Sequence, residues 1–415
     1  MSFPPDASLH DPAPSFYSRW CALNDWLRSH EALWRPVPFM EPQPGWARQW
    51  PELAAWLEAL SDADCDHYDA RPEQLANGLS RWLPGLAGHG ERIALPTLAP
   101  PPDRLAAVRL PETQAVDMPG RKRQQAGAFA AALLPLATGV LDWCCGKGHL
   151  ARTLARHGPT GVTGFEWNPQ LVADGNRLAR QFGDAVELRC QDVMAGDLTW
   201  PDATHGVALH ACGDLHRRLL HLAGTGAAPR LSLSPCCYHL TAADRHQPLS
   251  ERIRRNPDRL TLNRDELRLA VQETVTAPAR VRAQTAEASQ WRLGFDALQR
   301  QLRGCDHYLP VPSHPSRLMR EGFEAFCRWA AARKQLPLPD AVDWPYWLAV
   351  GRRRFRQVRR HELLRHLFRR PLELWLVLDY AVFLEEQGYR VRLGTFCERT
   401  LTPRNLLLDA RRDPP

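Results

Sequence analysis

Short apolar runs alternate with amphipathic stretches through the middle of the chain. A short apolar run bounded by glycine or polar residues is typical of a buried strand, and apolar residues recurring every three or four positions are typical of a helix. This pattern predicts strands at residues 140–143, 161–166, 186–190, 206–210 and 231–234, with helices to about residue 156 and over 170–182. Because strands that alternate with helices pack as a parallel sheet, we expect an α/β fold with helices on both faces.

The pattern resumes near the C-terminus. Residues 372–387 predict a long amphipathic helix, and residues 389–396 and 406–410 predict two strands joined by a turn at 401–405. These elements would complete a Rossmann-like sheet of seven strands. Residues 241–370 are mostly charged and predict helices, so we interpret them as an insertion between the fifth strand and the closing helix.

The first 110 residues are rich in proline and tryptophan, with apolar residues at helix spacing around Trp20 and Trp56. We interpret them as a helical cap that buries its tryptophans against the main domain; a substrate-recognition extension is the alternative. The expected division is a helical N-terminal region at 1–110, the first part of the sheet domain at 116–240, an arginine-rich helical insertion at 241–370 and the closing elements at 371–415.

Composition favours a cytoplasmic protein. The chain has no apolar run of about 18 residues or more, as a membrane span requires, and its first residues lack the basic start and apolar core of a signal peptide. Its eleven cysteines include two adjacent pairs, Cys144–Cys145 and Cys236–Cys237. Adjacent cysteines do not fit a disulfide framework, so we expect reduced thiols and a cytoplasmic location.

The formal net charge of +7 is compatible with an anionic partner. All but three of the 53 basic residues are arginine, however, and a GC-rich genome explains this bias equally well. Nine arginines lie in residues 352–370, interleaved with aromatic and aliphatic side chains. Arginines with aromatic neighbours suit phosphate groups and stacked bases, so we expect RNA, either tRNA or rRNA, as the partner. A solvated helix that packs one apolar stripe explains the same residues almost as well.

A glycine-bearing turn follows the first predicted strand. Residues 140–150 read VLDWCCGKGHL, so an apolar strand that contains Asp142 leads through a turn with Gly146 and Gly148 into a helix. Glycine in such a turn adopts backbone conformations closed to other residues and lets the backbone approach a ligand closely. The form is acid-x-Gly-x-Gly-x-Gly with Cys144 in place of the first glycine, and it resembles the first motif of the S-adenosylmethionine-dependent methyltransferases.

Acidic residues follow the next two predicted strands, at the sheet edge where open α/β folds bind their ligands. Glu166 could accept hydrogen bonds from both ribose hydroxyls of an adenosyl group, while Asp192 and the backbone N–H of Val193 could bind the adenine. A basic turn at 118–125, which includes Lys122, could reach the carboxylate of an amino-acid cofactor. We therefore expect S-adenosyl-L-methionine as the cofactor.

The loops after the fourth and fifth strands should face the methyl group. They read LHACGDL at 209–215 and LSPCCYH at 233–239. The candidate catalytic residues, as base, orienting group or nucleophile, are His210, Asp214, Cys236, Tyr238 and His239. His210 is also a candidate cofactor contact. For each residue taken singly, a role limited to shaping its loop is the alternative.

Three segments carry a more specific resemblance. CCGKGHL, ALHACGDL and SPCCYHL, in this order and spacing, resemble the methyltransferase-like 25 group, which includes ribosomal-RNA-adenine-dimethylase-domain-containing and glutathione-S-transferase-C-terminal-domain-containing proteins. The later LDYAVFLEEQGY and TPRNLLL resemble that group's closing helix and hairpin, so the resemblance covers about 116–240 and 370–415. A more distant similarity is to tRNA 2′-O-methyltransferases with a Cys-Cys-His-His-type loop.

The resemblance implies a class I methyltransferase sheet and assigns roles to particular residues. The residues that it implies for cofactor binding are Asp142, Gly146, Gly148, Glu166 and Asp192. The residues that it implies for the acceptor side are His210, Cys212, Asp214 and the loop 235–239. We accordingly expect direct methyl transfer to an oxygen or nitrogen of RNA, with a protein or a small molecule as the alternative acceptor.

Other chemistries compete with this interpretation. Seven soft ligands could converge at one edge of the sheet: Cys144, Cys145, Cys212, Cys236, Cys237, His210 and His239. Their spacing matches no usual zinc finger or ribbon, so we expect the cysteines to pack their turns and not to bind a metal. The Pro-Cys step at 235–236 is also typical of pyrimidine C5 methylation, but the partner motifs of those enzymes are missing. A non-catalytic protein that keeps the cofactor fold is a further alternative, which the cysteine at 144 would allow.

Overall fold

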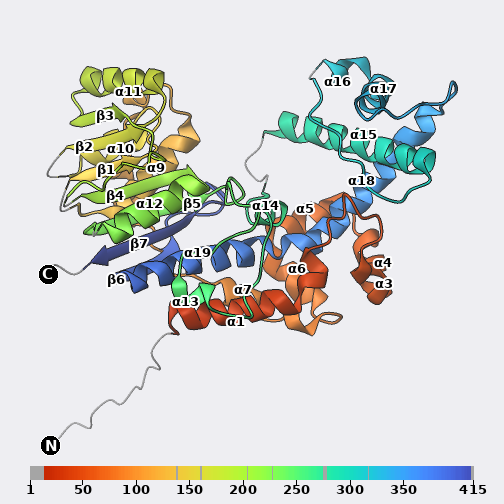
Figure 1. The fold of residues 1–415 in the computed structure, drawn as a ribbon, viewed down its shortest axis with the longest axis horizontal. Helices are drawn as coiled ribbons and strands as arrows, with labels where there is room; N and C mark the ends of the chain where they lie inside the picture. Colours follow the sequence, from red (N-terminus) through yellow and green to blue (C-terminus); the bar gives the residue numbers. More distant parts are fainter. Residues whose placement is uncertain are drawn as a thin grey trace, which may run out of the picture. The chain divides into compact units, whose positions relative to one another are not determined.

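The computed structural model describes residues 14–136, 139–158, 161–202, 204–226, 228–273, 278–315 and 317–412. They form two compact units (Figure 1). The sheet unit comprises Met1–Arg28, Leu95–Val271 and Leu372–Pro415, and the helical unit comprises Ser29–Ala94 and Gln272–Pro371. The units differ from the expected division, because most of the N-terminal region folds together with the second half of the insertion.

The sheet unit is built on a sheet of seven strands in the order β3-β2-β1-β4-β5-β7-β6. The strands are β1 (Val140–Trp143), β2 (Val162–Glu166), β3 (Val186–Cys190), β4 (His205–Cys212), β5 (Arg230–Cys236), β6 (Tyr389–Thr395) and β7 (Leu406–Arg412). The first five are parallel, and β7 runs antiparallel between β5 and β6. This topology confirms the predicted seven-stranded Rossmann-like sheet, and it brings the carboxyl ends of β1 to β5 to one edge.

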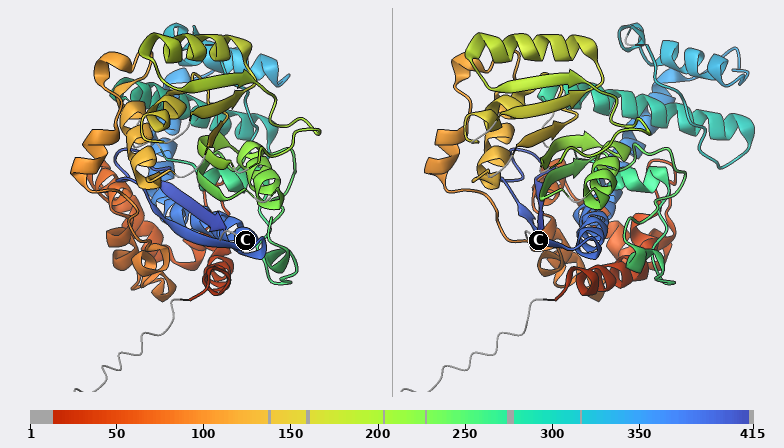
Figure 2. Two further views of the ribbon diagram at one scale, coloured as in Figure 1. Left: turned by 90° about the vertical axis from the view of Figure 1, so that its left-hand side faces the viewer. Right: turned by 60° about the vertical axis from the view of Figure 1, so that its left-hand side comes forward.

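Helices cover both faces of the sheet (Figure 2), and the side chains of β1 alternate between the two faces. Val140 belongs to a core with α9 (Gly120–Leu133) and α10 (His149–Ala155), and Asp142 points to the same face because side chains alternate along a strand. Trp143 points to the other face, where its indole N–H donates to the Leu215 carbonyl at 2.9 Å, in α12 (Asp214–Thr225). The strand is therefore apolar on both faces, apart from Asp142.

Further helices surround this sheet. They are α1 (Phe16–Ser29), α8 (Pro102–Val108), η2 (Glu112–Gln114), α11 (Pro169–Phe182), α13 (Glu251–Arg254), α14 (Arg264–Leu269) and α19 (Arg369–Glu386). Trp20 of α1 is buried against Trp375 of α19, with ring centroids 5.7 Å apart. The first tryptophan-rich stretch thus packs on a helix of the sheet unit.

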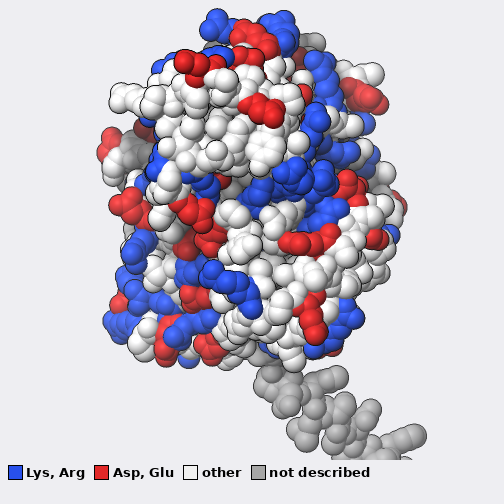
Figure 3. All heavy atoms as spheres, turned by 90° about the vertical axis from the view of Figure 1, so that its right-hand side faces the viewer, with Lys and Arg blue, Asp and Glu red and all other residues white. Residues whose placement is uncertain are grey.

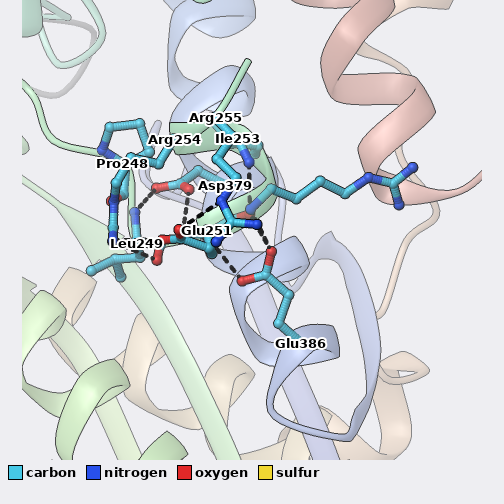
Figure 4. A network of polar contacts seen from close by, with 10 residues as sticks. Pro248, Leu249, Glu251, Ile253, Arg254, Arg255, Asp379 and Glu386 are labelled. Carbon is cyan, nitrogen blue, oxygen red and sulfur yellow. Dashed lines mark hydrogen bonds and ion pairs between the residues drawn. The ribbon is translucent and has the colours of Figure 1, made fainter.

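The chain that follows β5 is fastened to α19 by two carboxylates (Figure 4). Asp379 accepts the backbone N–H groups of Leu249 and Ser250 at 2.8 and 2.9 Å. Glu386 accepts the N–H groups of Glu251 and Arg252 at 3.0 and 2.9 Å, at the first turn of α13. Carboxylates at a helix N-terminus satisfy N–H groups that have no partner within the helix, so this segment has a fixed path.

The helical unit has its own apolar core, formed by residues such as Trp291, Phe295, Phe326 and Trp347. Its elements are α2 (Glu31–Trp34), α3 (Gly45–Gln49), α4 (Pro51–Ala59), α5 (Asp62–Ala70), α6 (Pro72–Leu79), η1 (Pro84–Leu86), α7 (His89–Ile93), α15 (Ala279–Arg303), α16 (Leu318–Glu321), α17 (Phe323–Arg333) and α18 (Trp344–His366). The long helices α15 and α18 approach closely, because a Cβ at Gly351 would lie 2.7 Å from the backbone nitrogen of Gly294. None of the described helices combines the length and the hydropathy that a membrane-spanning segment needs.

Candidate active site

The turn after β1 has the backbone conformation that its glycines predict. The φ angles are +57° at Gly146 and +69° at Gly148, in the left-handed region that favours glycine. A Cβ built on Gly146 would have no heavy atom within 4 Å, so a ligand can approach the backbone there. Cys144 also has a φ of +57°, and burial raises the pKa of its half-buried thiol to about 12. The cysteine thus adopts the conformation of the glycine that it replaces, and its thiol stays neutral.

Glu166 at the end of β2 is hydrogen-bonded to the backbone of this turn. Its Oε2 accepts the backbone N–H of Gly146 at 3.1 Å, and its Oε1 accepts that of Asn168 at 3.0 Å. An ionised carboxylate offers about four acceptor positions, so about two remain for other donors. Two ribose hydroxyls are donors of the right number and kind, and the geometry is compatible with the predicted role.

Asp142 connects β1 to the helix that follows the turn. It is 3% exposed, and its Oδ2 accepts the backbone N–H of Ala151 in α10 at 3.0 Å. Burial raises the pKa of this carboxyl to about 7, although the Ala151 hydrogen bond opposes the shift. The buried carboxyl therefore ties β1 to α10 and positions the glycine turn between them, and its contact with the cofactor stays a prediction.

Exposed apolar side chains lie where adenine was expected. Trp167 after β2 and Met194 after β3 are 74% and 47% exposed. Asp192 is also exposed, and its Oδ1 accepts the Met194 N–H at 2.9 Å, while the Val193 side chain is buried. An aromatic base could cover these apolar surfaces, and the backbone of Val193 remains beside them. These residues, like Glu166 and Gly146, fit an adenosyl group.

The start of α9 lies beside His210, because the helix begins at Gly120 and includes most of the predicted basic turn. Gln125 Oε1 is 3.3 Å from His210 Nε2, and Gln125 Nε2 donates to the Leu401 carbonyl at 3.1 Å. Burial lowers the pKa of His210 to about 4, and the exposed Lys122 contributes to the lowering. His210 is therefore a neutral imidazole at physiological pH, and Lys122 is within electrostatic reach of it.

The loops after β4 and β5 are joined through Gly213 and Asp214. The Asp214 N–H donates to the Leu240 carbonyl at 3.0 Å, and Asp214 Oδ2 accepts the Ala242 N–H at 2.8 Å. A Cβ at Gly213 would lie 1.9 Å from the Leu240 oxygen, and its φ is +53°. Only glycine fits there, and the hydrogen bonds of Asp214 fix the position of this loop.

Tyr238 is a buried residue of the loop after β5. Its side chain packs on His216 with ring centroids 5.7 Å apart. Burial raises the pKa of Tyr238 well above its usual value, so the phenol remains neutral. This packing favours the alternative in which Tyr238 shapes its loop, and its catalytic role stays a prediction. His239, the next residue, is half-buried, and its Nδ1 has no hydrogen-bond partner among the described residues.

Three residues near the site were not singled out individually by the sequence prediction. Arg404, between β6 and β7, helps to lower the pKa of His210 and that of Cys237. Its guanidinium donates to the Ala270 carbonyl at 2.8 Å and pairs with Glu373 at 3.1 Å. Gln125 and Gly213 are the other two. Gln125 and Arg404 stand in segments that had been noted, PGRKRQQ and TPRNLLL, but only the folded chain brings those segments to the ends of β4 and β5.

Comparison with known proteins identifies this part of the chain. Residues 134–244 match the model of a protein family described as "Methyltransferase domain". The matched segment contains β1 to β5, the glycine turn, Glu166 and both loops at the strand ends. Residues 134–244 are therefore similar to a methyltransferase domain. The open glycine turn and the two remaining acceptor positions of Glu166 are compatible with the S-adenosylmethionine that the sequence predicts as the cofactor.

Several solved structures share part of the fold. They include a geranyl diphosphate C-methyltransferase from Streptomyces coelicolor A3(2), 19% identical, with a TM-score of 0.23 over 26% of this chain and 44% of that chain. A tRNA (uracil-54, C5)-methyltransferase from Pyrococcus abyssi is 19% identical, with a TM-score of 0.24 over 28% and 29%. A magnesium protoporphyrin IX methyltransferase from Synechocystis is 20% identical, with a TM-score of 0.24 over 32% and 64%. The chain thus spans less than two thirds of each of these proteins, and no curated protein sequence matches it.

Proposed function

We propose that the protein transfers a methyl group from S-adenosylmethionine directly to an oxygen or nitrogen of RNA, either tRNA or rRNA. The observation that carries the methyl-transfer part is the meeting of three groups at one sheet edge. These are the open left-handed glycine turn, the Glu166 carboxylate bonded to that turn, and the loops with His210 and Cys237 at the ends of β4 and β5. The sulfonium of the cofactor supplies an electrophilic methyl group to an acceptor at this edge.

His210 is the residue best placed to assist the acceptor. Its imidazole is neutral because burial lowers its pKa to about 4, so it can accept a hydrogen bond or a proton from an acceptor hydroxyl or amine. Gln125 orients the ring through its contact with Nε2 at 3.3 Å. His239 offers a second nitrogen on the next loop. Cys236 is buried, which makes it a poor nucleophile and favours direct transfer over a covalent intermediate.

The RNA part of the proposal rests on a smaller surface than the sequence predicted. Much of the segment 352–370 holds the helical unit together: the Arg360 side chain donates to the Leu60 carbonyl at 2.8 Å, and the Arg365 side chain donates to that of Trp34 at 3.0 Å. Other arginines of the segment make similar contacts, among them Arg354, Arg359 and Arg369.

Three arginines of α18 remain exposed. They are Arg352, Arg353 and Arg356, and helical spacing places them on one face with the exposed Tyr346; we call these four residues the arginine stripe. Figure 3 shows arginine and lysine side chains lying side by side on one face of the molecule. Exposed guanidinium groups next to an aromatic ring favour a single-stranded nucleic acid, which offers phosphates and stacked bases.

Methyl tracing tests the acceptor. The protein is incubated with labelled S-adenosylmethionine and with total RNA, protein and small-molecule fractions from cells. We expect label in RNA of tRNA or rRNA size. Label that enters only protein or small molecules would refute the RNA acceptor and would favour the alternative acceptors. A protein that fails to bind S-adenosylmethionine at all would instead be a non-catalytic protein with a methyltransferase fold.

The arginine stripe is tested by replacing Arg352, Arg353 and Arg356 with glutamine. Each phosphate contact to single-stranded RNA contributes roughly 0.7 to the slope of log K against log salt, so the triple variant should lose about 2 from that slope. The control replaces three exposed arginines on other helices of the helical unit, Arg48, Arg320 and Arg333. Equal losses in the two triple variants would show that the stripe has no special role.

The subfamily of the protein and its cellular location are also proposals. The three cysteine-bearing segments support membership of the methyltransferase-like 25 group. The reduced cysteines support a cytoplasmic location.

A further inference from the structure

Three thiols converge at the ends of β4 and β5. Cys212 and Cys236 have their Sγ atoms 3.6 Å apart, and the Sγ atoms of Cys212, Cys236 and Cys237 all lie within 4.8 Å of one another. All three cysteines are free, although β4 and β5 pair Cys212 with Cys236 in register. The sequence predicted that these cysteines pack their turns, but packing does not require three sulfurs to face a common point.

The backbone around the three thiols contains a β-bulge and two residues with positive φ angles. A bulge between Leu209 and Cys212 shifts the register of β4, after which Cys212 pairs with Cys236. His210 and Cys237 have φ angles of +65° and +47°, which side chains other than glycine rarely adopt. Backbone strain of this kind clusters at functional sites. One of the two strained residues, Cys237, is itself a member of the thiol cluster.

Two residues after Cys237 the loop carries His239, and histidine is a second kind of zinc ligand. Cysteine binds a metal ion as the thiolate, so metal binding at this cluster would release protons from the thiols. The unpartnered Nδ1 of His239 adds a further nitrogen near the same loop.

We propose that Cys212, Cys236 and Cys237 bind one Zn²⁺ ion through their three sulfurs, with a fourth position open to solvent or to the acceptor. Zinc–sulfur bonds of about 2.3 Å in a tetrahedral arrangement place sulfurs about 3.8 Å apart, within the range set by 3.6 Å and 4.8 Å here. Three thiolates without a carboxylate select a soft ion over Mg²⁺ or Ca²⁺. Three protein ligands with one open position are the arrangement of catalytic zinc sites, whereas structural sites have four.

Metal titration tests the site without any need for methyltransferase activity. The reduced, full-length protein is stripped with a chelator and titrated with Zn²⁺, and then with Co²⁺, whose thiolate charge-transfer absorption reports sulfur ligation. We expect one ion per chain. Changes outside the coordination sphere typically weaken metal sites by roughly 10- to 100-fold, so Cys212→Ser or Cys237→Ser, which removes a direct ligand, should weaken binding at least ~100-fold. The matched control is Cys397→Ser, at a half-buried cysteine of the sheet unit outside the cluster.

Protection of the thiols gives a second readout that needs no variant. Bound Zn²⁺ should slow alkylation of Cys212, Cys236 and Cys237 in the wild-type protein, measured by mass spectrometry, while Cys397 is unaffected. If the serine variants fail to fold, this measurement still decides. Alkylation that is independent of zinc, the absence of stoichiometric binding, or a Cys212–Cys236 disulfide that zinc does not prevent would each overturn the proposal.

Discussion

Glu166 offers the sharpest test of the cofactor site, because one side chain holds the glycine turn and faces the expected ribose. Its two carboxylate oxygens already accept the N–H groups of Gly146 and Asn168 at 3.1 and 3.0 Å. Glu166→Gln keeps the size of the side chain and one carbonyl oxygen. It replaces the other oxygen by an NH₂ group, which points a donor at a backbone N–H and removes the charge.

The loss can be estimated from hydrogen bonds to a charged acceptor, worth about 1.5–3 kcal/mol each. Two ribose hydroxyls bound to Glu166 therefore contribute about 3–6 kcal/mol, which corresponds to roughly 10²- to 10⁴-fold in the dissociation constant of the cofactor. Glu166→Ala should lose this whole amount, and it should also lower the free energy of unfolding, since two N–H groups lose their acceptor. Glu166→Gln retains one carbonyl oxygen, so its loss of cofactor affinity should lie near the lower end of this range, at about 10²-fold.

Isothermal titration of S-adenosylmethionine or its product measures the dissociation constant, and thermal unfolding measures whether each variant is folded. Glu187→Gln on the neighbouring strand β3 is the matched control, because its side chain is 65% exposed and pairs only with Arg189 among the described residues. An exposed pair of this kind contributes about 0–1 kcal/mol. If folded Glu166→Gln bound the cofactor as tightly as Glu187→Gln, the ribose would bind elsewhere and our assignment of this edge would be wrong.

Two further predictions concern residues that shape the site. Burial raises the pKa of Asp142 from its ordinary value to about 7, so charging it costs stability as the pH rises through that value. Asp142→Asn keeps an acceptor for the Ala151 N–H and should raise the free energy of unfolding by a few kcal/mol at pH 8, but by little at pH 4. Urea unfolding at both pH values measures this, and an equal change at both would contradict it. Gly213→Ala should cost about 3 kcal/mol, because its Cβ would meet the Leu240 oxygen at 1.9 Å. Gly183→Ala, at a similar φ of +68° with nothing within 4 Å, should cost only about 1 kcal/mol.

The order and type of the strands could be predicted because each is marked locally. The strand predicted at 140–143 is observed as Val140–Trp143, and the strand predicted at 186–190 is observed as Val186–Cys190. The end of β4 was missed, since the strand continues past residue 210 to Cys212 through a bulge. A bulge depends on pairing with the neighbouring strand, here β5, and no local pattern of apolar residues marks it.

The residues of the candidate site also fall into two groups, those that the sequence could predict and those that it could not. Gly146, Gly148 and Glu166 were predicted because a turn and a strand end fix their positions along one short stretch of chain. The burial of Asp142 and Tyr238 was not predicted, because it depends on α10 and α12 packing over their side chains. The meeting of Cys212 with Cys236 depends on the register of two strands that lie 24 residues apart in the chain. A spacing of this length matches no metal-binding motif, and only the paired strands bring the two sulfurs together.

The arginines of residues 352–370 show why the extent of the proposed RNA surface cannot be predicted from the sequence. A guanidinium group has five N–H donors in a fixed geometry, so it can join backbone carbonyls of several helices as readily as phosphates. Arg360 and Arg365 use their donors on the carbonyls of Leu60 and Trp34. These acceptors are about 300 residues away in the chain, so no pattern within α18 distinguishes the arginines that use them from the exposed ones. The formal charge of +7 is therefore spread over structural and exposed groups alike, and only the exposed arginines can raise the affinity for RNA in a salt-dependent way.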